Sequence, residues 1–182
     1  MKASDKELLR YALADHAFRE ADALAQHIIE SKFSPDSHVV SAALAGVVVC
    51  YCRPFMSATG LGPLPQAMQR FDGEKEEVGL RTIHEHLMEA RHKLAAHFDR
   101  DYSEEKHKSG VLLLPPSEVT VELKREGFVV ATNAAYMNPD GLPMARALFA
   151  FQMERVKARL GSIAVAMLSE HKKLGKFVFK VS

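Results

Sequence analysis

Apolar residues recur at intervals of three and four along several stretches of the chain, which predicts amphipathic helices. The first stretch follows Ser4-Asp5-Lys6-Glu7, a sequence that fits a capping box. Its apolar positions extend from Leu8 to Ile29 and fall on one side of a helix. The pattern therefore predicts a long first helix whose apolar face is covered by other elements.

The second stretch is apolar on nearly all sides between Val39 and Cys52. Ser34-Pro35 is expected to begin this helix, because serine caps well and proline fits the first helical turn. Arg53-Pro54 and the run from Gly60 to Pro65 are expected to end it. The stretch is too short, and too interrupted by Ser41 and Gly46, to span a bilayer of about 30 Å, so it predicts a buried central helix.

Two further helices show an apolar seam of the coiled-coil type. The third is expected from about Glu74 to Phe98, and His97 falls on the next step of its seam. The fourth is expected to open at Pro143 and to end at Gly175. The seam residues are Leu80, Ile83, Leu87, Ala90 and Leu94 in the third helix, and Phe149, Met153, Val156, Leu160, Ile163 and Met167 in the fourth.

Between these two helices the pattern changes to a period of two. Val119, Val121 and Leu123 alternate with polar residues, Arg125-Glu126-Gly127 supplies a turn, and residues 128–132 can return as a second strand. Residues 177–181 could add a third strand or cover the helices. The chain is thus expected to be one mainly α domain over residues 1–182, an antiparallel up-and-down four-helix bundle with a β-hairpin insert at about 111–135.

Composition narrows the class of protein. The 182 residues are 47% hydrophobic and 26% charged, as in ordinary globular domains, and the formal net charge is only +1. No strongly basic surface is indicated, so any nucleic-acid contact must be local. Cys50 and Cys52 lack the further ligands of a zinc site and are expected to be buried, reduced thiols. The charged N-terminus does not fit a signal peptide, so a cytoplasmic protein without membrane contact is expected.

A candidate motif lies near the end of the third helix, where Arg91 is followed by the polar His92 and then, after four more residues, by His97. This motif, together with the segment from Tyr51 to Phe55, resembles the HEPN superfamily, whose signature is Arg, four to six residues, then His. The resemblance covers roughly residues 5–100 and the last helix and leaves the hairpin outside the common core. It implies an up-and-down helical bundle that acts as a homodimer.

The resemblance also implies a function. Members of the family include metal-independent RNA endonucleases of defence and toxin–antitoxin systems, so it implies a possible antitoxin or nucleotidyltransferase partner and no cofactor. Arg91 would hold the scissile phosphate and His97 would move the proton of the ribose 2′-hydroxyl. His92, Lys93 and Arg53 are the candidates for further substrate contact.

Helix geometry makes a single copy of this motif a poor active site. Positions six apart on a helix differ in direction by about 120° and are separated by about 9 Å along the axis. Two copies in antiparallel chains could instead bring two arginines and two histidines into one cleft. The function therefore depends on dimerisation near this helix end.

Simpler interpretations exist for each of these residues. His97 can be a core or interface histidine on the seam, and Arg91 can cover apolar surface or pair with Glu85 or Glu89. Arg53 can cap the carbonyl groups of its own helix, and His92 and Lys93 can be solvated. On this interpretation the chain is a HEPN-like dimerisation or partner-binding module without catalysis.

A metal-binding helical protein is a third possibility. Glu89 and His92 form a Glu-x-x-His sequence of the kind that di-iron bundles carry, and Glu85 shares their face. The sequence appears once, and the other helices offer no clear partners. His84 and His86 point to different faces and are expected to be exposed.

Overall fold

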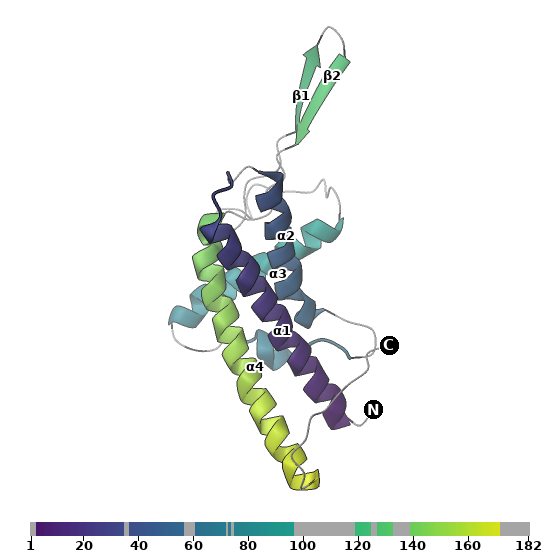
Figure 1. Ribbon diagram of the computed structural model, residues 1–182, viewed down its shortest axis with the longest axis vertical. Coiled ribbons are helices and arrows are strands. Elements are labelled where there is room, and N and C mark those ends of the chain that lie inside the picture. Colours follow the sequence, from purple (N-terminus) through teal and green to yellow (C-terminus); the bar gives the residue numbers. More distant parts are fainter. Residues whose placement is uncertain are drawn as a thin grey trace.

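The computed structural model covers the whole chain and describes residues 3–34, 37–56, 61–71, 73, 75–96, 119–124, 127–132 and 139–171. Its described part is mainly helical, as the sequence predicts. The helices are α1 (Ala3–Glu30), α2 (His38–Cys52), α3 (Lys75–Ala96) and α4 (Leu142–His171), as Figure 1 shows. Short 3-10 turns lie at η1 (Arg53–Phe55), η2 (Gln66–Gln69) and η4 (Pro139–Gly141).

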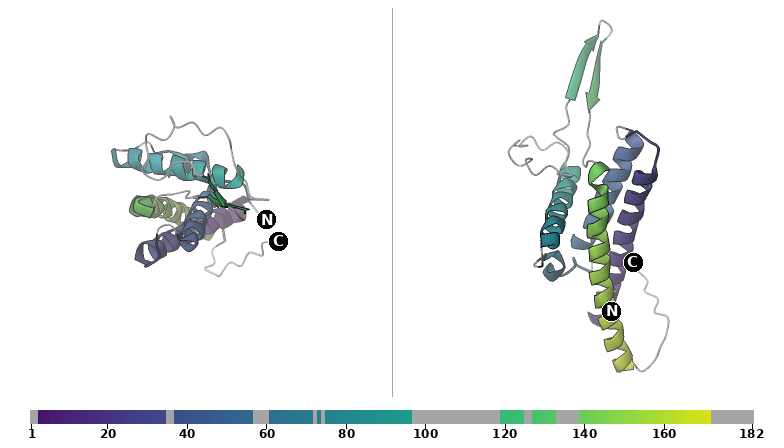
Figure 2. Two further views of the ribbon diagram at one scale, coloured as in Figure 1. Left: turned by 90° about the horizontal axis from the view of Figure 1, so that it is seen from above. Right: turned by 90° about the vertical axis from the view of Figure 1, so that its left-hand side faces the viewer.

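Helices α1 and α4 form the most extensive helix pair. Arg159 in the middle of α4 pairs with Glu7 near the start of α1, and Arg146 near the start of α4 pairs with Asp22 toward the end of α1. These two pairs show that the helices run antiparallel. Helix α4 contacts α1 on one side and α3 on the other, while α2 packs against α1 and α3 (Figure 2).

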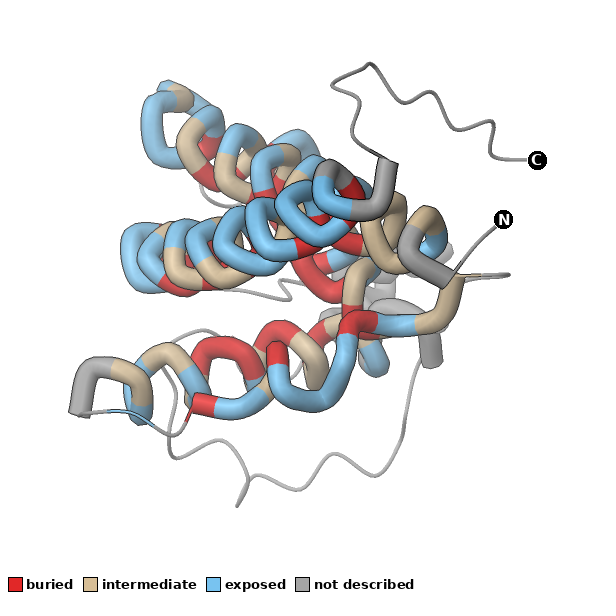
Figure 3. The backbone as a smooth tube through the Cα atoms, turned by 90° about the horizontal axis from the view of Figure 1, so that it is seen from below, coloured by how far each residue is buried: buried red, intermediate tan, exposed pale blue. Residues whose placement is uncertain are grey.

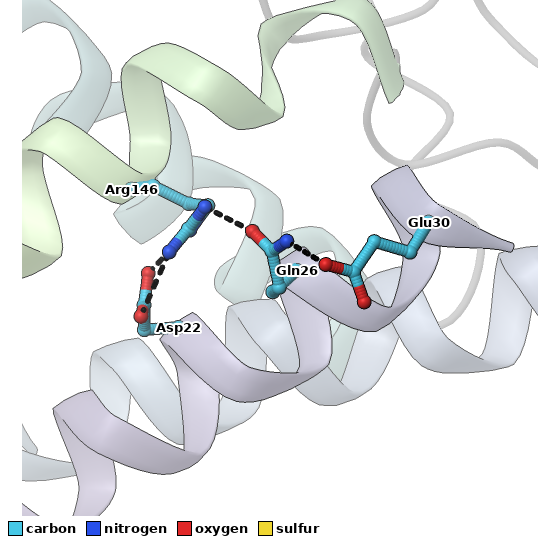
Figure 4. A network of polar contacts seen from close by, with 4 residues as sticks. All are labelled: Asp22, Gln26, Glu30 and Arg146. Atoms are coloured by element: carbon cyan, nitrogen blue, oxygen red, sulfur yellow. Dashed lines mark hydrogen bonds and ion pairs between the residues drawn. The ribbon is translucent and has the colours of Figure 1, made fainter.

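A polar network fixes the register at one end of the α1–α4 pair (Figure 4). Arg146 donates to both carboxylate oxygens of Asp22, with an Nε–Oδ1 distance of 2.6 Å and an Nη2–Oδ2 distance of 3.2 Å. A further guanidinium nitrogen donates to Gln26, whose amide donates to Glu30. A forked arginine contact of this kind is directional, so it specifies how far one helix is shifted along the other.

One apolar core lies between the helices, and Figure 3 shows buried residues on the helix faces that turn toward one another. Its largest fully buried side chains include Tyr51, Phe18, Phe71 and Phe149. The rings of Phe18, Phe55 and Phe149 all lie within 5.7 Å of the Tyr51 ring, centroid to centroid. The core therefore has an aromatic centre that joins α1, α2, η1 and α4.

Helix α2 is only partly the buried helix that its sequence predicts. Val40, Leu44, Val47, Val48, Tyr51 and Cys52 are buried, but Val39 is 56% exposed and Val49 is 37% exposed. The expectation that this stretch is too short to span a bilayer is wrong by length and composition, because the segment His38–Phe55 is long and apolar enough to do so, and 39% of it is buried. The other faces of the helix lie against solvent because its neighbours α1 and α3 cover only one side.

Several predicted boundaries are wrong by a few residues. Helix α1 already includes Ala3, so Ser4 lies inside the first turn instead of capping it. Helix α2 begins at His38, because Ser37 is the N-cap and its Oγ accepts from the Val40 amide at 3.2 Å. Ser34 instead accepts the Ser37 amide at 2.9 Å through its backbone carbonyl. Two serines three residues apart are equivalent cap candidates in sequence, and only the path of the chain from α1 decides between them.

Strands β1 (Val119–Lys124) and β2 (Gly127–Thr132) pair antiparallel, with Val121 opposite Val130 and Lys124 opposite Gly127. The predicted third strand at 177–181 and the predicted helix end at Gly175 lie outside the described residues. Helix α4 begins one residue before Pro143, which therefore occupies the first turn, as expected.

Candidate functional site

Arg91 lies on the face of α3 that turns toward α2. It follows His84 by seven residues, which is about 20° short of two full helical turns, so the two side chains share a face. His84 contacts Tyr51 of α2, and Leu87, between them, accepts a hydrogen bond from Cys52 Sγ at 3.3 Å through its carbonyl oxygen. Arg91 is therefore directed along the α2–α3 seam.

The position of Arg91 close to Cys52 is shown by its effect on the pKa of the Cys52 thiol. Burial raises the pKa of the Cys52 thiol to about 12, and the positive charge of Arg91 opposes this rise. The Arg91 side chain itself is half-buried. At the edge of the apolar seam, the methylene groups of an arginine can pack against apolar side chains while its guanidinium group binds an anion.

The other predicted site residues are distributed differently. His92 is exposed beside Arg91, whereas His97 and the side chain of Lys93 lie outside the described residues. Arg53 is exposed and turns toward α1, where its Nη1 lies 3.9 Å from Glu20 Oε2. The structure therefore places Arg53 and Arg91 against different neighbours, and it does not bring them together.

Sequence reasoning missed a buried polar contact in the centre of the core. Tyr51 Oη and His84 Nδ1 are 2.7 Å apart, and His84 is only 6% exposed. The rings of Tyr51, Phe55 and Phe71 lie 5.0–5.8 Å from the His84 ring, centroid to centroid. The expectation that His84 is exposed is wrong, and His86 is half-buried.

Burial sets the protonation of this pair. It lowers the pKa of His84 to about 4 and raises the pKa of Tyr51 well above its usual value. Both groups are therefore neutral near pH 7. A side-chain hydrogen bond from Gln152 acts on the Tyr51 hydroxyl and opposes the rise in its pKa. One hydrogen bond joins Tyr51 Oη and His84 Nδ1, and the His84 tautomer decides which of the two atoms donates.

This pair is buried among aromatic rings, so it holds α3 against α2 and has no access to a substrate. A signal for it exists in the sequence, because Leu80, His84, Leu87 and Arg91 follow a spacing of four, three and four. That spacing places His84 and Arg91 on the same helix face as Leu80 and Leu87 of the predicted seam. His84 was predicted to be exposed because histidine is polar. The sequence does not show that Tyr51 lies beside it and forms a hydrogen bond with it.

The segment between α2 and α3 is held by side chains from three helices. Gln152 of α4 donates to Met68 O at 3.1 Å, and Arg155 of α4 donates to Met68 O at 3.1 Å and to Ala67 O at 2.6 Å. Arg81 of α3 donates to Phe71 O, and Arg10 of α1 donates to Leu61 O at 2.8 Å. The carbonyl groups of an irregular segment need such donors, because no helix or strand satisfies them.

At its start the same segment turns through Gly62, which has a φ of +70° that L-residues rarely adopt. Leu64, Met68 and Phe71 are buried, so the segment also covers the core. It therefore joins α1, α3 and α4 through side-chain hydrogen bonds.

A metal centre is not formed by the residues that the structure describes. Among them, no group of three or more His, Cys, Asp or Glu side chains lies close enough to hold an ion. Glu85, Glu89 and His92 all belong to this part of the chain, so they do not converge as the metal hypothesis requires. Cys50 and Cys52 are both free thiols, with Cys52 buried and Cys50 half-buried.

No protein family, curated protein or solved structure matches this chain in comparisons of its sequence and its structure.

Proposed function

We propose that the chain is a HEPN-like protein that acts as a homodimeric, metal-independent RNA endonuclease in the cytoplasm, in a defence or toxin–antitoxin setting. An antitoxin or nucleotidyltransferase is the expected partner. The proposal includes an antiparallel up-and-down helical bundle with a β-hairpin insert between α3 and α4.

The placement of Arg91 carries the proposal. Its half-buried side chain lies on the α2-facing side of α3, within the electrostatic range of Cys52, five residues before the last residue of the helix. The exposed His92 follows it directly. A guanidinium is suited to a phosphate because its planar fork binds two oxygen atoms at once. In the proposed mechanism Arg91 binds the scissile phosphate and His97 removes the proton of the 2′-hydroxyl.

The test compares the wild type with Arg91→Ala and His97→Ala on a mixed cellular RNA substrate in the presence of EDTA. We expect both variants to keep their helical circular dichroism spectrum and their mass in solution while cleavage falls by at least about a hundredfold, the range expected for a general base. Arg19→Ala is a matched control, because Arg19 is an exposed arginine that pairs only locally with Asp15. Undiminished cleavage by a double Arg91 and His97 variant would exclude the mechanism.

A non-catalytic HEPN-like module is the second candidate. It is favoured by the near-zero net charge and by the position of Arg91 in a packed seam, where an arginine can be structural. RNA that stays intact under all conditions, together with a stable dimer, is the result expected for this alternative.

A further inference from the structure

The segment between α2 and α3 has little regular structure and few buried side chains. We call residues 61–71 the strap. Its regular part is the 3-10 turn η2, and three of its side chains, those of Leu64, Met68 and Phe71, are buried. A region with irregular backbone and few buried apolar contacts opens at a lower cost than the helices around it. The strap is therefore expected to open before the helices do.

Arg155 of α4 is the main anchor of the strap. Its guanidinium donates to Ala67 O at 2.6 Å and to Met68 O and Arg70 O at 3.1 Å each. The bonds to Ala67 and Arg70 are exposed, so water competes for both partners. The same guanidinium lies over the Phe151 ring, 5.2 Å from its centroid. An anchor at the surface can release the strap without moving α4.

Arginines from α1 and α3 fix the two ends of the strap. Arg10 donates through Nε to Leu61 O at 2.8 Å, and Arg81 donates to Phe71 O. Gly62, next to the first of these carbonyl groups, has a φ of +70° and can absorb a change in backbone direction as a hinge. Because the donors at both ends are side chains, these bonds can break without breaking a backbone hydrogen bond of any helix.

The strap covers buried polar groups of the core. The ring of Phe71 lies 5.3 Å from the ring of His84 and 5.8 Å from that of Phe151, centroid to centroid. Gln152 is fully buried and donates through Nε2 to Met68 O at 3.1 Å. Its Oε1 is also buried, and it accepts no hydrogen bond from any residue that the structure describes. A buried acceptor without a donor is unfavourable, and contact with water relieves that cost.

We propose that the strap opens as one unit while α1, α2, α3 and α4 stay folded, and that its opening exposes His84 and Gln152 to solvent. Opening takes the Phe71 ring away from His84 and Met68 O away from Gln152 in the same step, because both belong to the strap. The inference does not rest on the proposed function, since it concerns only the contacts of this segment.

Opening would also loosen α3. The closed strap links α3 to α1 and α4 through Arg81, Arg10 and Arg155. When these links are broken, α3 keeps only its direct packing against α2 and α4. Helix α3 carries Arg91, so opening and closing of the strap would change how firmly that residue is held.

The first test measures amide hydrogen exchange of the full chain at pH 7. Backbone hydrogen bonds are formed by the strap amides of Leu64, Met68 and Arg70. After correction for intrinsic rates, we expect these three amides to share one opening equilibrium. They should exchange at least about tenfold faster than the slowest amides of α4. Strap amides that are as slow as those of α4, or three amides with unrelated protection, would overturn the proposal.

A substitution of the main anchor separates opening of the strap from unfolding of the chain. Arg155→Ala should accelerate exchange of the strap amides by at least about tenfold, because it removes several of their neighbours' hydrogen bonds at once. Amides within the helices should keep their rates. Arg159→Ala is the matched control, because Arg159 lies one turn further along α4 and pairs with Glu7. Equal acceleration of the strap and of α4 by Arg155→Ala would contradict a separate opening of the strap.

Chemical labelling tests what the opening exposes. Diethyl pyrocarbonate modifies accessible histidines, and His84 is only 6% exposed when the strap is closed. Peptide mapping by mass spectrometry should show that Arg155→Ala accelerates modification of His84 by about the same factor as exchange of the strap amides. His92 is the internal control, because it is exposed and should react equally in both proteins. A His84 that stays unreactive while the strap amides of Arg155→Ala exchange faster would overturn the proposal.

Discussion

Helix α1 meets α4 through charged groups near the surface, whereas α2 meets α3 through neutral groups in the core. At the first interface, Asp22 and Arg146 have side chains that are 27% and 36% exposed, and Glu7 and Arg159 are 34% and 50% exposed. At the second, Tyr51 is fully buried and His84 is 6% exposed. Both contacts set the register of a helix pair, but water competes with only one of them.

The difference teaches where the loss of a polar contact is costly. An exposed ion pair that is broken leaves two groups that water can solvate, so the expected cost is small. A buried hydrogen bond that is broken leaves a polar atom without a partner in an apolar site. The α2–α3 seam should therefore be more sensitive to substitution than the α1–α4 pair, although its helices share a smaller contact.

The largest effect is expected from Tyr51→Ala, which removes a ring at the centre of the aromatic cluster. Tyr51 contacts Phe18, Phe55, Phe149 and His84, so the substitution creates a cavity and breaks a hydrogen bond. We expect the free energy of unfolding to fall by about 3–5 kcal/mol in urea titrations. A loss below about 1 kcal/mol would mean that the cluster is not packed as described.

The next effect is a dependence of stability on pH that originates in His84. Its pKa is about 4 in the folded protein and about 6.5 in the unfolded chain, so the unfolded state binds more protons between these values. Stability should therefore be fully present above pH 6.5 and fall as the pH decreases toward 4, by an amount on the order of 3 kcal/mol.

The measurement compares urea titrations of the wild type and His84→Gln between pH 7 and pH 4. Glutamine keeps an acceptor for the Tyr51 hydroxyl but does not titrate, so its profile should be flatter over this range. His92→Gln is the control, because His92 is exposed and should leave the wild-type profile unchanged. Parallel profiles for the wild type and His84→Gln would contradict the burial of His84.

A smaller effect is expected from Tyr51→Phe, which keeps the ring and removes only the hydroxyl. His84 Nδ1 then loses its partner at 2.7 Å. We expect the free energy of unfolding to decrease by about 1–3 kcal/mol, the range for an unsatisfied buried group. The double variant Tyr51→Phe with His84→Leu removes both partners and should recover part of that loss, so a fully additive result would argue against a direct bond.

Breaking the charged contact at the other interface should cost less. Asp22→Asn weakens the forked contact with Arg146 in the network of Figure 4 but leaves hydrogen-bonding groups in place. We expect a loss of about 0.5–1 kcal/mol at low salt, and a smaller one in 1 M sodium chloride, where such pairs are screened.

The smallest effect should come from Arg159→Ala, because Arg159 and Glu7 are the more exposed pair. A decrease of no more than about 0.5 kcal/mol is expected in the same urea titrations. If this substitution, or Asp22→Asn, destabilised the protein more than Tyr51→Phe, the order drawn from the comparison would be reversed.

Much of the helical fold could be predicted from the sequence. The intervals of three and four identify most of the core-facing residues, since Ile83, Leu87 and Ala90 of the predicted seam are buried. The predicted apolar face of α1 is only partly correct, because Leu13 and Ile29 are exposed. These signals are local, because a helix repeats its own face every few residues whatever it packs against. The motif at Arg91 was also visible in the sequence, although His97 lies outside the described residues.

The tertiary structure alone decided where the polar side chains go. From the sequence, Glu85 and Glu89 were candidate partners of Arg91, and His84 was expected to be exposed. Both predictions used only the charge and polarity of each residue, because the sequence does not show which residues meet in space. The structure instead directs Arg91 along α2 and buries His84 against Tyr51, which is 33 residues away. It also leaves Val39 and Val49 of α2 exposed, because the number of helices that pack around α2 is set by the assembled bundle and not by the sequence of α2 itself.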